Sequence, residues 1–124
     1  MKSRSKLLEI AHRLIDAFNA WDEDQIIGCR TEDCLHEFWP SGLGHDNAAA
    51  RAHFAATKET FRRFHVDVVD HVEDSVAGRV VLFAHASMYT PKGEMLLDYV
   101  LLLDISEAEG KISRIVQMNH PRFV

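Results

Sequence analysis

Apolar residues in the first part of the chain recur at the spacing of a helix. From Ser5 to Ala20 this spacing predicts an amphipathic helix with one face towards a core. The recurring residues are Leu7, Ile10, Ala11, Leu14, Ile15 and Phe18. Asp22 can cap a second, short helix that ends near Cys29, because a carboxylate accepts hydrogen bonds from the free N–H groups of a first helical turn. The chain is therefore expected to begin with two helices.

A short strand is expected after these helices. Residues 31–33 indicate a turn, and Leu35–Trp39 indicates a strand that ends at Pro40, because proline cannot donate to a sheet ladder. Successive side chains of a strand point to opposite faces. The inward set is therefore either Cys34, His36 and Phe38 or Leu35, Glu37 and Trp39, and the periodicity leaves both alternatives open.

The pattern changes from helical to β-rich after a third helix. Asp46 or Asn47 can cap this alanine-rich helix, which continues to about Thr60 and directs Phe54 and Phe61 inward. Beyond it lie four β-rich segments separated by short turns, and short connections indicate antiparallel hairpins. The four predicted strands are Phe64–Val72, Arg79–Tyr89, Glu94–Ile105 and Lys111–Asn119.

The order ααβαββββ predicts an α+β fold with the helices on one side of an antiparallel sheet. We expect the sheet to curve around the long N-terminal helix as a cone, whose open end would hold a small molecule in an apolar cavity with a few polar groups. A chain of 124 residues fits a single domain, residues 1–124. Because apolar residues such as Val80–Phe83 occupy both faces of the later strands, a homodimer through the sheet is expected.

Composition narrows the classes of function. The chain is 47% hydrophobic with a formal net charge of -5, so nothing favours nucleic acid or a membrane as a partner. His12, Arg13 and Asp16 interrupt the first apolar set before it resembles a signal peptide, and a cytoplasmic protein is expected. The histidines show no HxH or HExxH spacing, and Cys29 and Cys34 form no CxxC pair. No metal is therefore expected, and the lack of GxSxG, P-loop and dinucleotide-binding motifs argues against triad hydrolysis, phosphoryl transfer and Rossmann-type redox chemistry.

Asp98 is the first candidate for chemistry. It interrupts the apolar run Met95–Ile105, and a carboxylate in a buried strand must be solvated, paired or protonated. We expect Asp98 in the pocket wall as a catalytic group or substrate ligand, with Tyr99 beside it as a core aromatic whose hydroxyl lies at the rim. The alternative is that Asp98 lies at the mouth of the strand and meets water.

Two amides in the last predicted strand are candidates for binding substrate. Gln117 and Asn119 share a face opposite Arg114, whose charge indicates that its own face is the less buried one. Both amides are therefore expected in the pocket, where they could orient a carbonyl or hydroxyl by hydrogen bonds. Capping of backbone groups near the strand end is the alternative.

Further candidates come from the other strands. His36 and Glu37 are possible acids or bases, with a surface or dimer-interface position as the alternative, and Trp39 could stack on a flat substrate. Phe83 and His85 share one face of their strand and could reach the pocket. The histidines expected at the surface are His45, His53, His65, His71 and His120.

Several local patterns together resemble the SnoaL-like branch of the NTF2-like superfamily, above all its small fungal members from secondary-metabolite pathways. They lie between Ser5 and His120 and comprise Cys34–Gly44 (CLHEFWPSGLG), Asn47, Phe61–Phe64, Glu73-Asp74, Ala86, Thr90, Gly93 and Asp98-Tyr99. The resemblance implies a cofactor-free, commonly dimeric protein. Such members are cyclases, isomerases, dehydratases or hydrolases acting on polyketide or terpenoid intermediates, or have no known activity.

The chain departs from that pattern at its acidic positions. The fungal members often carry Glu where this chain has Asp98, and acidic residues where it has Gln117 and His120. Related isomerases place a catalytic carboxylate just before a Pro-x-Gly turn, where this chain has Trp39 before Pro40. These departures affect the reaction expected more than the fold.

Two functions follow from these expectations. The first is a cofactor-independent isomerase or cyclase, in which Asp98 or His36 moves a proton beside a carbonyl held by Gln117 and Asn119. Trp39, Phe83 and the apolar face of the long helix would shape its cavity. The second is a small-molecule-binding module or dimeric accessory protein, which the missing carboxylates favour.

Overall fold

The computed structural model describes residues 4–58, 60 and 62–123 of the chain. Its helices are α1 (Lys6–Ala20), α2 (Glu23–Gly28) and α3 (Asn47–Thr57). Its strands are β1 (Arg30–Trp39), β2 (Leu43–His45), β3 (Arg62–Asp74), β4 (Arg79–Thr90), β5 (Gly93–Ser106) and β6 (Lys111–Phe123). The inward position expected for Phe61 lies outside the described residues.

Each helix begins at a side-chain cap. Ser5 accepts a hydrogen bond from the N–H of Leu8 at the start of α1. Asp22 and Asp46 cap α2 and α3 in the same way, with N–H to carboxylate distances of 3.1 and 2.8 Å. These bonds satisfy donors that a first helical turn leaves free. The predicted starts of all three helices are therefore confirmed, and Asp46 rather than Asn47 is the third cap.

The six strands form one sheet in the order β2-β1-β6-β5-β4-β3. Neighbouring strands are antiparallel except β1 and β6, which run parallel. The α+β class is confirmed, but the sheet is mixed and contains β2 as an additional short strand. Residues 31–33 are also not the turn that was expected, because they lie within β1 where its register with β6 shifts. Such an irregularity lets extra residues remain within a strand.

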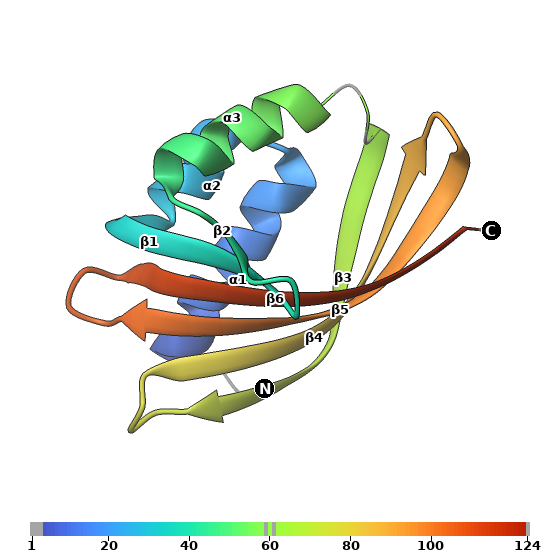
Figure 1. Ribbon diagram of the computed structural model, residues 1–124. Helices are drawn as coiled ribbons and strands as arrows, with labels where there is room; N and C mark the ends of the chain where they lie inside the picture. Colours follow the sequence, from blue (N-terminus) through green and yellow to red (C-terminus); the bar gives the residue numbers. More distant parts are fainter. Residues whose placement is uncertain (1–3, 59, 61, 124) are drawn as a thin grey trace.

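The sheet is curved, and the helices lie on its concave side (Figure 1). The apolar face predicted for α1 is buried there, with Ile10, Ala11 and Leu14 at most 1% exposed. These side chains share one core with Leu82 of β4 and Leu103 of β5. Phe18, in the last turn of α1, is only partly buried, because a cavity lies beside it.

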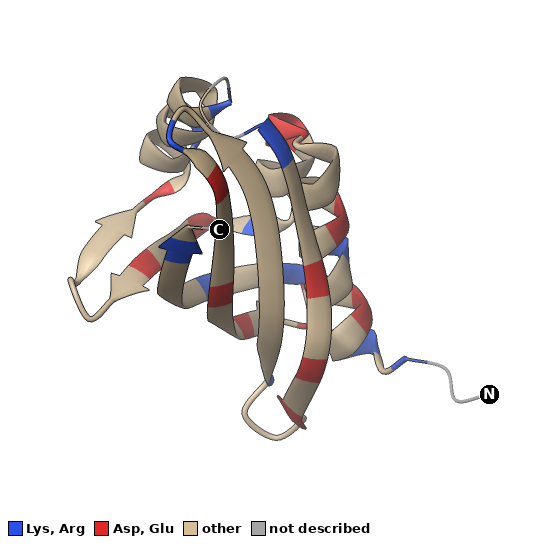
Figure 2. Cartoon of the chain, turned by 90° about the vertical axis from the view of Figure 1, so that its right-hand side faces the viewer, with Lys and Arg blue, Asp and Glu red and all other residues tan. Residues whose placement is uncertain are grey.

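The convex side of the sheet is partly exposed and carries charged side chains. Figure 2 shows Lys, Arg, Asp and Glu interspersed over the strands and helices of the side in view. On the convex side, ion pairs join neighbouring strands, among them Arg79 with Asp104 and Arg114 with Glu37. No helix in the described part of the chain is long and apolar enough to cross a membrane.

Candidate functional site

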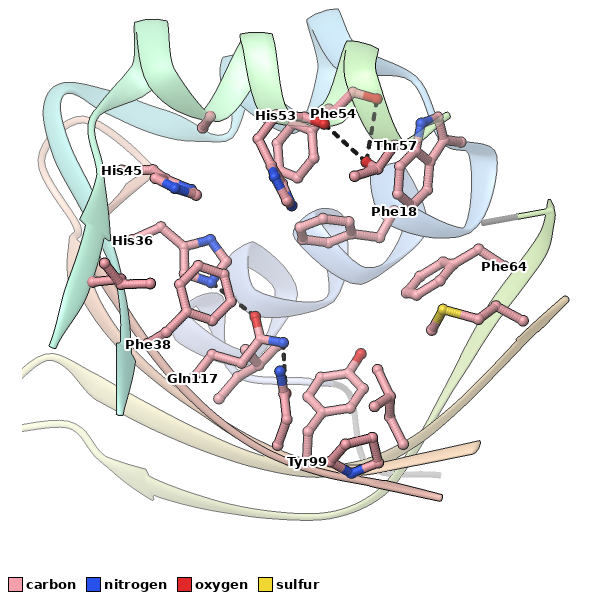
Figure 3. Close-up of a pocket in the computed structure, with 18 of the residues that line it drawn as sticks. Phe18, His36, Phe38, His45, His53, Phe54, Thr57, Phe64, Tyr99 and Gln117 are labelled. Carbon is pink, nitrogen blue, oxygen red and sulfur yellow. Dashed lines mark hydrogen bonds between the residues drawn. The ribbon is translucent and has the colours of Figure 1, made fainter. Parts of the chain in front are cut away.

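A cavity of about 460 Å³ lies between the concave face of the sheet and helices α1 and α3 (Figure 3). Its volume falls in the range of small-molecule sites. Most of its lining is aromatic or aliphatic, and the described lining residues include no Asp, Glu, Lys or Arg. Its polar members are His36, His45, His53, Thr57, Tyr99, Gln117 and Asn119. Any chemistry in this cavity therefore depends on imidazole, amide and hydroxyl groups.

Aromatic rings from three elements form one end of the cavity. Phe18 and Trp21 lie at the end of α1, Phe54 on α3 and Phe64 on β3. The rings of Phe18 and Phe54 meet edge-on at 5.7 Å between centroids, and those of Trp21 and Phe64 at 5.2 Å. Edge-to-face contacts at these distances are attractive beyond the area that they bury. This end is a packed apolar wall.

Three neutral polar side chains form a hydrogen-bonded row along the opposite wall (Figure 3). Nε2 of His36 lies 2.8 Å from Oε1 of Gln117, and Nε2 of Gln117 donates to Oδ1 of Asn119 at 2.8 Å. Pairing of β1 with β6 brings His36 next to Gln117, and alternation along β6 places Asn119 on the same face. The row therefore depends on two strands that are far apart in the sequence.

The direction of these hydrogen bonds assigns the tautomer of His36. Because Gln117 presents its oxygen, Nε2 of His36 carries the hydrogen and donates, and Nδ1 is an acceptor. Burial lowers the pKa of His36 to about 4, the positive charge of Arg30 acts in the same direction, and the bond to Gln117 opposes them. His36 is therefore a neutral imidazole at pH 7.

His45 and His53 continue the polar wall towards α3. The ring of Phe38 stacks on His36 at 4.6 Å and meets His45 edge-on at 5.7 Å. The ring centroids of His45 and His53 are 5.2 Å apart. Burial, followed by the charge of His45, lowers the pKa of His53. Among the described residues, no group of three or more His, Cys, Asp or Glu side chains is arranged to hold a metal ion.

Tyr99 supplies a phenol to the cavity from β5. Its side chain is almost wholly buried, and burial raises its pKa well above the usual range of tyrosine. The phenol therefore stays protonated and can donate a hydrogen bond. Of the site residues predicted from the sequence, the cavity brings together His36, Tyr99, Gln117 and Asn119.

Asp98 lies on the other face of the sheet, and its expected position in the pocket wall is wrong. Its carboxylate contacts Nδ1 of His85 at 2.7 Å and Arg122 at 3.5 Å, in a separate groove on the convex side. The reason is alternation: Tyr99 faces the cavity, so its neighbour Asp98 cannot. The prediction failed because Val100 and Leu102, which share its face, are partly buried and made the strand look internal on both sides.

Glu37, Trp39, Phe83 and His85 also lie outside the cavity, contrary to expectation. Both carboxylate oxygens of Glu37 bind Arg114 at 3.0–3.1 Å, and this bond is the main reason that the pKa of Glu37 is lowered. Nε1 of Trp39 donates to the same carboxylate at 3.2 Å. Phe83 and His85 line the convex groove beside Asp98. In β1 the inward set is therefore Cys34, His36 and Phe38.

The sequence interpretation missed the contribution of α3 and β2 to the site. His45 and His53 were expected at the surface; His53 is exposed as expected and His45 is half-buried, and both line the cavity. A signal was present, because four residues at helical spacing share one face of α3 and all line the cavity; they are Ala50, His53, Phe54 and Thr57. His45 carried no local signal, since β2 has only three residues and its pairing with β1 determines where they point.

Comparisons with known proteins agree with this architecture. The SnoaL-like domain family matches residues 11–115. Austinoid biosynthesis cluster protein F of Aspergillus calidoustus is 32% identical over an alignment of 111 residues, and the match covers 85% of this chain and 63% of that protein. The chain thus spans less than two thirds of that relative.

Two solved fungal structures share the fold. PrhC from Penicillium brasilianum NBRC 6234 superposes with a TM-score of 0.89 at 20% identity, covering 96% of this chain and 83% of that one. BvnE pinacolase from Penicillium brevicompactum gives a TM-score of 0.88 at 19% identity, and the superposition covers 96% of this chain and 88% of that one. At these identities the likeness is one of fold. The family match over most of the chain shows more: this protein belongs to the SnoaL-like domain family.

Proposed function

We propose that the protein is a cofactor-independent isomerase or cyclase that moves a proton on a small, uncharged polyketide or terpenoid intermediate of secondary metabolism. The row of His36, Gln117 and Asn119 in an otherwise apolar cavity carries this proposal. A neutral substrate fits best, because the described lining offers no charged side chain to compensate a buried phosphate, carboxylate or ammonium. The similarity to an austinoid biosynthesis cluster protein and, in fold, to a pinacolase supports this class of substrate.

Nδ1 of His36 is the proposed base. Its lone pair is free for substrate because the ring hydrogen lies on Nε2, and no hydrogen bond to Nδ1 is made within the described residues. A base with a pKa near 4 can remove a proton next to a carbonyl when hydrogen bonds stabilise the resulting enolate. Protonation makes His36 an imidazolium, which strengthens its donation to Gln117.

Asn119 is the proposed ligand of the substrate oxygen. Its Oδ1 accepts from Gln117, so its N–H groups remain free to donate into the cavity. As the proton moves to His36, negative charge develops on the oxygen at one end of the row and positive charge on the imidazole at the other. The aligned amide dipoles stabilise both charges. Return of the proton from His36 to a different carbon completes an isomerisation.

Deuterium exchange tests this proton transfer without the natural substrate. The probe is a neutral polycyclic ketone, such as a steroid enone, incubated with the protein in D₂O, and mass spectrometry follows deuterium uptake next to the carbonyl. His36→Ala is expected to slow protein-dependent uptake by about 10²–10⁴-fold, the usual contribution of a general base. Asp98→Ala is the matched control and is expected to exchange at the rate of the unaltered protein.

Two results would contradict this assignment. Uptake that persists in His36→Ala would remove His36 as the base. An equal loss in Asp98→Ala would move the chemistry to the convex face. Thermal unfolding of both variants establishes that each is folded at the temperature of the assay.

A binding module without chemistry is the second candidate, and the absence of any carboxylate from the described lining favours it. The chain has two tryptophans, of which Trp21 lines the cavity and Trp39 is exposed on the opposite face. Trp39→Phe therefore leaves Trp21 as the only indole reporter of binding. Quenching of Trp21 by the ketone without deuterium uptake would support this second function.

We also propose that the convex face binds a second copy of the chain. Val69, Phe83 and Met118 are exposed there, at 60%, 39% and 44%. Both signs of charge lie at the groove between them, with the Asp98 carboxylate 3.5 Å from the Arg122 guanidinium. A surface with an apolar centre and both positive and negative charges at its edge can be complementary to a second copy of itself across a two-fold axis. A dimer through the sheet would cover it.

A further inference from the structure

Two imidazole rings on the α3 side of the cavity form no hydrogen bond with any described residue. His45 lies on β2 and His53 on α3, and both rings point into the cavity (Figure 3). Their centroids are 5.2 Å apart, and neither ring has a hydrogen-bond partner within the part of the chain that the structure describes. We refer to these two rings as the imidazole pair.

The polar groups beside the imidazole pair already have partners. In the row, His36, Gln117 and Asn119 bind one another. The hydroxyl of Thr57 donates within α3, to the backbone carbonyl of His53 at 2.9 Å. The imidazole pair therefore holds unused hydrogen-bonding capacity on this side of the cavity.

The ring of Phe38 separates the imidazole pair from the row. It stacks on His36 at 4.6 Å and meets His45 edge-on at 5.7 Å. Contacts thus run from Asn119 along the row to His36, across Phe38, and only then to the imidazole pair. A substrate oxygen that Asn119 holds is therefore not shared with the pair.

The imidazole pair is suited to a neutral group. Burial, followed by the charge of His45, lowers the pKa of His53, and two imidazolium ions this close would repel each other. The described lining includes no Lys or Arg that could help to bind an anion. A neutral imidazole has one N–H donor and one bare nitrogen that accepts. One ring can therefore donate to a bound group while the other accepts from it.

These rings set a requirement on any substrate that fills the cavity. Such a molecule displaces the water that otherwise satisfies the ring nitrogens. An apolar group at this place would leave a donor and an acceptor unsatisfied, which lowers affinity. A hydroxyl can accept from one ring and donate to the other, whereas a carbonyl can only accept.

We propose that the imidazole pair is a hydroxyl-binding subsite, so that the substrate is a hydroxy ketone with its hydroxyl at His45 and His53 and its carbonyl at Asn119. The hydroxyl position follows from the free ring nitrogens and their place in the cavity, whereas the carbonyl position rests on the proposed function. The substrate class is thereby narrowed to intermediates that carry oxygen at two separate positions.

Binding of matched probes tests this subsite. Each set shares the polycyclic enone skeleton of the exchange experiment and carries a hydroxyl, a carbonyl or only hydrogen at one position remote from the enone. Several sets place this group at different positions, with the hydroxyl in both configurations. Quenching of Trp21 in the Trp39→Phe protein gives the dissociation constants.

The variants are made in that same Trp39→Phe protein. His53→Leu and His45→Leu each remove one ring, and His53→Gln keeps a donor and an acceptor. His71→Leu is the matched control, because His71 is exposed on β3 and lies outside the cavity lining. Thermal unfolding establishes that each variant is folded at the temperature of the assay.

We expect the best hydroxy enone to bind about tenfold more tightly than its hydrogen analogue, and more tightly than its carbonyl analogue. His53→Leu and His45→Leu should each reduce this preference to about twofold or less. His53→Gln should retain part of it and His71→Leu all of it.

Three results would overturn the subsite: no hydroxyl position is preferred, the carbonyl analogue binds as tightly as the hydroxy enone, or the preference survives both leucine variants. Each concerns a ratio of affinities within one protein. Deuterium uptake by the hydrogen analogue tests the proposed proton transfer separately, so that failure of the subsite and failure of the proposed function are distinguished.

Discussion

The two faces of strands β5 and β6 both carry polar side chains but put them to different uses. On the concave face, Tyr99, Gln117 and Asn119 are neutral and line a cavity. On the convex face, Asp98 binds His85 and Arg122 beside a shallow groove. The charged groups of these strands thus lie on the convex face, and the neutral hydrogen-bonding groups line an otherwise apolar cavity.

This difference shows what kind of chemistry each face supports. A charge against the apolar walls of the cavity would carry a desolvation cost that those walls cannot offset, whereas amides and a neutral imidazole are satisfied by one another. The ion pairs of the convex face are exposed and contribute little to stability. The concave face is therefore the better place for catalysis, and the convex face the better place for association.

The largest expected contrast compares adjacent leucines of β5. Leu103 is 0% exposed on the concave face, and Leu102 is half-buried on the convex face. Leu103→Ala should lower the free energy of unfolding by about 2–5 kcal/mol, because it leaves a cavity in the core. Leu102→Ala should cost clearly less, since solvent can occupy the space vacated. Urea unfolding measures both, and equal losses would show that the convex face is buried in solution.

The pH dependence of stability gives the next contrast. The pKa of His36 is about 4 in the folded protein, whereas the ordinary value for histidine, taken for the unfolded chain, is 6.5. The unfolded chain therefore binds the proton first as the pH falls. Stability is therefore lost between about pH 6.5 and pH 4, by roughly 3 kcal/mol in total, and no further below that window.

Denaturant unfolding across this window tests the assignment. His36→Gln, which stays neutral, should remove this part of the acid destabilisation. His85→Gln on the convex face controls for the loss of a histidine as such. A His36→Gln variant with the full acid sensitivity of the unaltered protein would show that His36 is not the residue held neutral.

A smaller contrast compares neighbours at the end of β6. Asn119→Leu removes the proposed donor to the substrate oxygen and should slow deuterium uptake into the ketone by about 10–100-fold, a modest value because Tyr99 remains. His120→Leu, on the other face, should leave uptake unchanged. If the two variants behave alike, Asn119 has no special role in holding the oxygen.

The smallest contrast concerns association through the convex face. Phe83→Ser places a polar side chain in the proposed dimer interface and should weaken self-association by about tenfold or more, while cavity binding of the ketone stays the same. Light scattering during size-exclusion chromatography measures the mass over a range of concentrations. A monomeric unaltered protein, or an unaffected dimer in Phe83→Ser, would remove the convex face as the interface.

Local features of the sequence were sufficient for the elements and for part of the site. The cap at Asp22 and the apolar face of α1 follow from hydrogen bonds and periodicity within a few residues. The charge of Arg114 correctly indicated that Gln117 and Asn119 face inward, because an ion in mid-strand selects the wetter face. Asp98 was misassigned because half-buried apolar neighbours resemble fully buried ones in a sequence.

By itself, the sequence determined where the helices and long strands lie, that they form an α+β fold, and which two side-chain sets each strand offers. Only the tertiary structure decided which set faces the cavity. Alternation always leaves two equivalent faces, and the choice between them is made by contacts between distant segments. The hydrogen bond from His36 to Gln117 joins residues 81 positions apart, and the pairing of β2 with β1 brings His45 to the same wall. No local pattern encodes these contacts, because they exist only once the sheet has closed around α1.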